Sequence, residues 1–142
     1  MKKQAKRWQG LLLTIFVLLF SVVVAACGSK KADGDVLFRE EGTLVISVTE
    51  AEDGSTLKDV MESMQEKGKL TFSEDENGFI KTVDGYSKTG EYWFLYTSCT
   101  EYTNGTWGTT VYEGKEYASA TLGYESLPAV EGALYIWKSA AW

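Results

Sequence analysis

The chain has 142 residues, with 14 basic and 20 acidic side chains, a formal net charge of −6 and no histidine. This charge balance argues against a nucleic-acid-binding protein, because such proteins present a basic surface. The lack of histidine removes the commonest general base and the commonest transition-metal ligand. We therefore expect no catalytic residues, no cofactor and no enzyme activity.

The first 26 residues have the pattern of a secretory signal. Four basic residues, the last of them Arg7, precede an apolar run of about 14 residues from Leu11 to Val24. A membrane-spanning helix needs about 20 apolar residues, so the run is too short to cross a bilayer. We expect residues 1–26 to be removed, which leaves ten basic residues against twenty acidic ones and a net charge of −10.

A cysteine, Cys27, follows Val-Ala-Ala at the end of this signal. The arrangement resembles a bacterial lipobox, which implies cleavage before Cys27, a lipid on its thiol and a location at the extracytoplasmic face of the cell membrane. The alternative is an ordinary signal-cleavage site that happens to precede a cysteine. Once Cys27 carries lipid, Cys99 is the only free thiol, so no intramolecular disulfide can form.

Residues 27–41 are predicted to be the lipidated cysteine and a flexible tether. The stretch Ser-Lys-Lys-Ala-Asp-Gly-Asp is polar, contains glycine and lacks periodicity. Residues 42–142 are long enough for one compact domain with its own core.

The strongest helix signal begins at Thr56. Thr56 and Asp59 match a capping box, in which each side chain binds the backbone N–H of the other residue. Apolar residues then recur at i, i+3, i+4 and i+7 as Leu57, Val60, Met61 and Met64, and Gly68 ends the pattern. The sequence predicts one amphipathic helix with this stripe in the core.

The rest of the domain has strand patterns. The predicted strands are 43–49, 70–72, 79–83, 91–98, 109–112, 117–120 and 133–137, with 100–108 as a loop. One helix laid on a mixed or antiparallel sheet is an α+β fold.

The predicted strand at Tyr92–Tyr96 carries large apolar side chains at every position. Alternation places Tyr92, Phe94 and Tyr96 on one face, and Trp93 and Leu95 on the other. Either both faces are buried, or one face is free to bind a ligand.

The order of these pieces resembles a known family. Ile80-Lys-Thr-Val-Asp-Gly85, a short spacer and then Tyr92-Trp-Phe-Leu95 are similar to the C-terminal β-domain of the vitamin B12 carriers transcobalamin and intrinsic factor. They also resemble bacterial transcobalamin-like C-terminal domains, which are described as a domain of unknown function. The resemblance covers Gly42–Trp142 and implies a small β-grasp-like α+β fold.

In those carriers, the corrinoid lies between this β-domain and a larger helical barrel. The resemblance therefore implies ligand contacts at Trp93, Phe94 and Leu95. Other aromatic residues expected near that face are Tyr86, Tyr102 and Trp107. Two features depart from the carriers: the helical barrel is missing, and the segment Cys99–Gly108 is longer than the corresponding loop.

The leading hypothesis is a lipid-anchored surface module that captures or presents a small molecule, with a corrinoid (cobalamin) as the first candidate. Its partners would be a membrane transporter or a helical subunit. The same aromatic face could instead dock another protein in interaction or adhesion. A third hypothesis is a surface protein that binds metal through acidic turns such as Glu74–Gly78.

Overall fold

The computed structural model of the chain describes residues 30–142. The predicted signal peptide and Cys27 therefore lie outside the described residues. Within the described range, no helix combines the length and the apolar character needed to cross a membrane.

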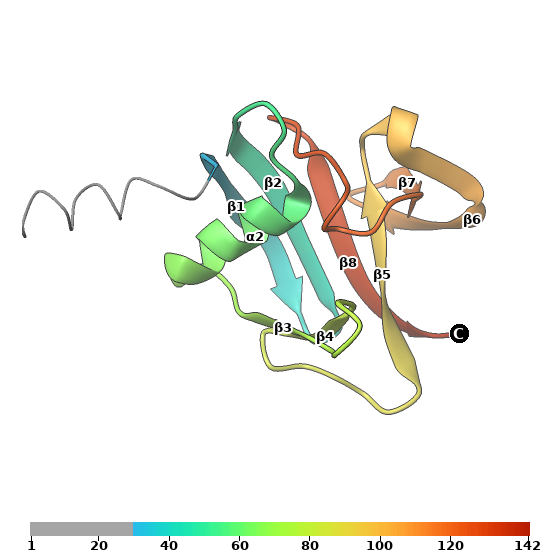
Figure 1. Cartoon of the computed structure of the whole chain (residues 1–142). Coiled ribbons are helices and arrows are strands. Elements are labelled where there is room, and N and C mark those ends of the chain that lie inside the picture. Colours follow the sequence, from blue (N-terminus) through green and yellow to red (C-terminus); the bar gives the residue numbers. More distant parts are fainter. Residues whose placement is uncertain (1–29) are drawn as a thin grey trace, which may run out of the picture.

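The described chain contains eight strands and a single α-helix (Figure 1). The strands are β1 (Ala32–Glu40), β2 (Thr43–Ala51), β3 (Phe72–Glu74), β4 (Ile80–Val83), β5 (Glu91–Thr97), β6 (Thr103–Tyr112), β7 (Lys115–Ala120) and β8 (Leu134–Ala141). The helix is α2 (Leu57–Glu66), and a short 3-10 turn covers Thr100–Tyr102.

Six strands form one sheet in the order β1-β2-β8-β5-β7-β6, and β3 and β4 form a separate hairpin. Every strand pair is antiparallel. The predicted α+β, β-grasp-like fold with a mixed or antiparallel sheet was therefore wrong, because this is a mainly-β fold. The chain contains more β structure than its sequence pattern predicts, because β1 lies in the predicted tether and the first half of β6 lies in the predicted loop.

The predicted tether is corrected over most of its length. Ala32–Glu40 forms β1, an edge strand that pairs with β2 from Ala32↔Ala51 to Glu40↔Thr43. Aspartate and glycine disfavour strands, so the start of β1, Ala-Asp-Gly-Asp, gives no local strand signal. The strand is stabilised by tertiary contacts instead: Ala32 and Gly34 are buried, and Asp33 binds Lys67 and Lys69 beyond the end of α2.

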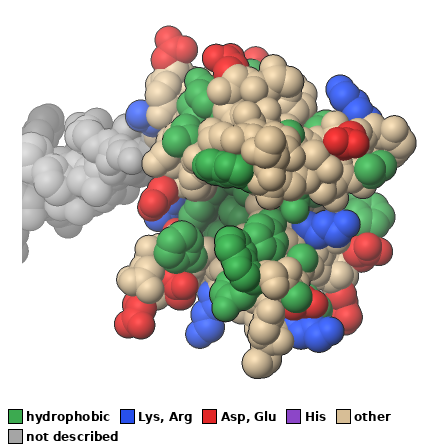
Figure 2. Space-filling model, turned by 90° about the vertical axis from the view of Figure 1, so that its right-hand side faces the viewer, with side chains coloured by type: hydrophobic (Ala, Val, Ile, Leu, Met, Phe, Trp, Pro, Cys, Tyr) green, Lys and Arg blue, Asp and Glu red, His purple; other side chains and the backbone are tan. Residues whose placement is uncertain are grey.

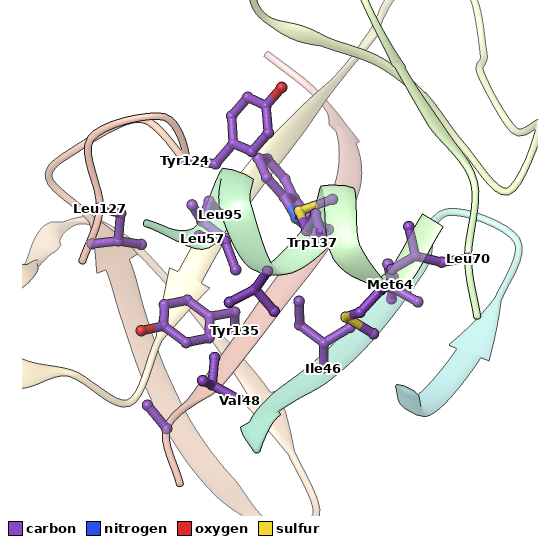
Figure 3. Close-up of a cluster of buried hydrophobic side chains, with 14 of the residues drawn as sticks. Ile46, Val48, Leu57, Met64, Leu70, Leu95, Tyr124, Leu127, Tyr135 and Trp137 are labelled. Atoms are coloured by element: carbon purple, nitrogen blue, oxygen red, sulfur yellow. The ribbon is translucent and has the colours of Figure 1, made fainter. Parts of the chain in front are cut away.

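The helix prediction is confirmed. The Thr56 N–H donates to Asp59 Oδ2 at 2.9 Å, and the Asp59 N–H donates to Thr56 Oγ1 at 3.4 Å. All four residues of the apolar stripe are buried. They pack on one face of the large sheet with Ile46, Val48, Leu95, Tyr135 and Trp137, as Figure 3 shows.

The opposite face of the sheet is partly covered by the β6–β7 hairpin. Tyr117 on this hairpin packs with Val45 and Ile136 in a second small core. The hairpin reaches across to β1, where the Phe38 and Tyr112 ring centroids are 6.2 Å apart. The predicted hairpin is confirmed, but the predicted loop at 100–108 was wrong from Thr103 onward, where β6 begins.

Candidate functional site: an aromatic patch on the sheet

Alternation along β5 sends its side chains to two different environments. Leu95 is 8% exposed, and Trp93 packs against the core on the helix side. Phe94 and Tyr92 point to the opposite face, beyond the area that the β6–β7 hairpin covers. One face of the aromatic strand is therefore core, and part of the other face is open.

The open part is an aromatic patch, which we define as Tyr92, Phe94 and Trp142. These three side chains line a shallow hollow of about 440 Å³. Tyr92 is 61% exposed and Trp142 is 96% exposed. The Phe94 and Trp142 rings are nearly parallel, with planes 16° apart and centroids separated by 6.1 Å.

Figure 2 views the molecule from the side where the C-terminal end lies in Figure 1. Hydrophobic side chains gather in the middle of this face, and charged side chains border them. An exposed apolar cluster with a polar border is typical of a binding surface.

The border of the patch includes Lys138, which lies directly opposite Phe94 in the β5–β8 pairing. Its ammonium donates a hydrogen bond to Thr110 Oγ1 at 3.4 Å. Tyr96 follows Phe94 on the same face, and burial raises the pKa of its hydroxyl.

The structure does not bring the six predicted ligand-binding residues together. Only Phe94 belongs to the patch. Leu95 and Trp93 face the helix side, and Tyr86 packs edge-on against Trp93 with a centroid distance of 6.0 Å.

The remaining two predicted residues follow β5 in the chain. Tyr102 packs against the main core. Trp107 is 64% exposed on β6, where Gly105–Gly108 bulge out of the pairing between Asn104 and Thr109. The prediction thus combined residues from the core, the patch and a separate bulge.

Two residues of the patch were not among the predicted ligand contacts. Tyr92 had a usable signal, because it alternates with Phe94 on one face of the strand. Trp142 lies at the end of β8, so no periodic pattern continued far enough to assign it to a face. Only the sheet register places it beside β5, since Ala141 pairs with Glu91.

The other candidate sites are occupied by structural contacts. Cys99 Sγ lies 3.7 Å from the hydroxyl of Tyr135, and burial together with this contact raises the pKa of Tyr135. In the acidic turn, Asp75 Oδ1 accepts the N–H groups of Asn77 and Phe79 at 2.8 and 3.1 Å. Across residues 30–142, no group of three or more cysteines or acidic residues is placed to hold a metal ion.

Comparison with protein-family models, with curated proteins and with solved structures gave no match to this chain. The resemblance to transcobalamin-like domains therefore stays a prediction.

Proposed function

We propose that this protein is a lipid-anchored binding module at the extracytoplasmic face of the cell membrane. In this proposal, the aromatic patch holds a flat small molecule. The observation that carries it is the nearly parallel pair formed by the half-buried Phe94 and the exposed Trp142, with the exposed Tyr92 beside it. Rigid aromatic rings offer a large contact area at a low entropy cost. Cobalamin is the first candidate ligand, because the resemblance implies a corrinoid.

The patch covers only one side of such a ligand. Its hollow is shallow and open to solvent, whereas tight small-molecule sites enclose most of the ligand surface. We therefore expect a dissociation constant of about 1 μM or weaker for the isolated module. A helical partner subunit or a membrane transporter would cover the free side of the ligand.

The position of the patch fits capture from outside the membrane. The chain enters the sheet at Ala32, which pairs with Ala51 at the end of β2, whereas Lys138 pairs with Thr43 at the start of β2. A nine-residue strand such as β2 spans about 27 Å along the sheet. The start of β1 and the C-terminal end accordingly lie on opposite sides of the molecule (Figure 1). A lipid on Cys27 would therefore attach at the end far from the patch.

Isothermal titration calorimetry tests the proposal directly. Residues 30–142 are titrated with cobalamin, cobinamide and haem, and the titrations are repeated with Phe94→Ala. Phe79→Ala is the matched control, because Phe79 is 70% exposed but lies in the β3–β4 turn. Thermal unfolding shows whether each variant remains folded.

We expect saturable heat with a corrinoid, at least tenfold weaker binding for Phe94→Ala, and unchanged binding for Phe79→Ala. The tenfold loss corresponds to about 1.4 kcal/mol, which is modest for a central aromatic contact. Equal binding by the two variants, or no heat with any of the three compounds at high micromolar concentration, would overturn the proposal.

A further inference from the structure

We infer that the ligand of the aromatic patch carries an acidic group, either a carboxylate or a phosphate, and that Lys138 pairs with this group. The inference rests on the proposed function, because it concerns the ligand of the same surface. It is carried by the position and the surroundings of this one lysine.

Lys138 is placed beside the patch by the sheet register. It lies directly opposite Phe94, so both side chains project from the same face. Side chains opposite each other in an antiparallel pair have Cβ atoms about 5 Å apart. The hydrogen bond to Thr110 ties the ammonium to the β6–β7 hairpin, which closes over the neighbouring part of this face. The charge is thus held at the border between the covered half and the open half.

This ammonium has no acidic partner among the described residues. Lys58, Lys67, Lys69 and Lys88 each form at least one ion pair, whereas Lys138 forms none with any residue between 30 and 142. Four other lysines of this range, Lys30, Lys31, Lys81 and Lys115, also form no ion pair, but only Lys138 lies directly opposite a residue of the patch.

Across the β8–β2–β1 pairing at this level of the sheet, the acidic residue in line with Lys138 is Glu40. Thr43 lies between Glu40 and Lys138 in the pairing. Two strand spacings separate the backbones by about 10 Å. Lys138 is therefore free to bind a ligand anion through a charge-assisted hydrogen bond.

The net charge of the mature chain opposes this local attraction. A net charge of −10 draws cations to the protein in general. At physiological ionic strength the screening length is about 8 Å, so distant carboxylates contribute little at the patch, while a direct contact with Lys138 persists. The two effects therefore predict opposite preferences. The net charge of the whole chain favours a cationic ligand, whereas Lys138 favours an anionic one.

The test uses two water-soluble planar macrocycles of similar size and opposite charge. These are a porphyrin with four carboxyphenyl groups and a porphyrin with four N-methylpyridinium groups. Each is titrated calorimetrically into residues 30–142 at physiological salt, and into Lys138→Gln, Lys138→Arg, Phe94→Ala and the control Lys81→Gln. Lys81 is an exposed lysine on β4, so its substitution changes the net charge equally but away from the patch.

We expect the anionic porphyrin to bind more tightly than the cationic one. Lys138→Gln should weaken binding of the anionic porphyrin about fivefold, which is the upper range for an exposed ion pair. Lys138→Arg and Lys81→Gln should change its affinity by less than about twofold. Phe94→Ala should weaken the binding of both porphyrins.

The possible failures are distinguishable. If Phe94→Ala weakens both porphyrins but Lys138→Gln changes neither, or if the cationic probe binds more tightly to the unaltered protein, the inference is wrong and the proposed function stands. If neither porphyrin binds, the inference is wrong, and the titrations with cobalamin, cobinamide and haem decide whether the proposed function fails with it.

Discussion

At the scale of single residues, Gly34 sets how closely α2 approaches β1. A Cβ atom at this position would lie 2.6 Å from the Ser47 carbonyl oxygen, and 3.1 Å from both Met64 Sδ and Val60 Cγ1. The backbone oxygen cannot move aside as a flexible side chain can. Position 34 therefore requires glycine, because any side chain there would clash with the Ser47 carbonyl oxygen.

Gly34→Ala is expected to lower the free energy of unfolding by about 2 kcal/mol, because the added methyl group overpacks the contact between helix and strand. Urea unfolding followed by tryptophan fluorescence measures the change. Gly123→Ala is the control, since its added Cβ would have no atom within 4 Å. A Gly34→Ala protein as stable as the control would show that β1 and α2 do not pack this closely.

The residues of the aromatic patch were only partly predictable from the sequence. Phe94 was among the predicted ligand contacts, but so were Trp93 and Leu95, which alternation along the strand places on the core side. The pleat of a strand could have separated these sets beforehand. Trp142 could not be predicted, because its position depends on the register of β8 against β5.

At the scale of elements, a small ionic cluster fastens β1 to the end of α2. Asp33 Oδ2 lies 2.6 Å from Lys67 Nζ and 3.2 Å from Lys69 Nζ. Burial alone raises the pKa of the Asp33 carboxyl, but the hydrogen bonds that it accepts from Lys67, the Gly34 N–H and Lys69 outweigh burial. The pKa of Asp33 therefore lies below its ordinary value.

This lowered pKa predicts a pH dependence of stability. The contribution of Asp33 is fully present above the pKa of an unfolded aspartate, about 3.9, and is lost as the pH falls through the lower folded value. Asp33→Asn should lower the free energy of unfolding by about 1.5 kcal/mol at pH 7. The variant should also lose less stability than the unaltered protein as the pH falls below 4. Thermal unfolding between pH 2.5 and 7 tests this, with the exposed Asp53→Asn as control. Parallel curves for the two variants would contradict the role of Asp33.

The N-terminus of α2 gives a second prediction at this scale. Thr56→Ala removes the oxygen that accepts the Asp59 N–H, so we expect a loss of about 1 kcal/mol in the free energy of unfolding. Thr56→Ser keeps this oxygen and should retain most of the stability. Equal losses in the two variants would show that the methyl group, and not the cap, is responsible.

Elements with a local signal were predictable and those without it were not. The capping box and the four-residue stripe fixed α2, and strand propensity fixed β2 and β5. β1 and the start of β6 are rich in aspartate, glycine, asparagine and threonine, which also occur in tethers and turns. Their strand geometry comes from pairing with distant residues, which a local pattern does not encode.

At the scale of the whole molecule, β1 belongs to the folded domain. It covers one edge of β2, and its buried residues Ala32 and Gly34 lie next to the helix. The predicted boundary at residue 42 would therefore cut through the structure.

A protein of residues 30–142 should unfold in a single cooperative thermal transition. A protein of residues 42–142 should lack this transition, because removal of β1 exposes the packed surface of β2 and α2. Circular dichroism during heating distinguishes the two results. A cooperative transition at the same temperature in the shorter protein would show that the domain folds without β1 and that this segment is only a tether.

The arrangement of the strands determines which part of this sheet face is open to solvent. The β6–β7 hairpin covers Val45 and Ile136, and the uncovered remainder carries the aromatic patch. The four tryptophans of residues 30–142 lie in three regions. Trp93 and Trp137 pack in the main core, where Trp137 donates its indole N–H to Met61 Sδ, whereas Trp107 lies on the β6 bulge and Trp142 lies in the patch.

The most direct measurement is a nitrogen–proton NMR spectrum of residues 30–142 during titration with cobalamin. We predict that the indole signal of Trp142 and the amide signals of Tyr92, Phe94 and Lys138 shift progressively, while the indole signal of Trp137 stays in place. Shifts confined to Trp107 or to α2, or an unchanged spectrum at high micromolar cobalamin, would contradict the assignment of the aromatic patch as the binding surface.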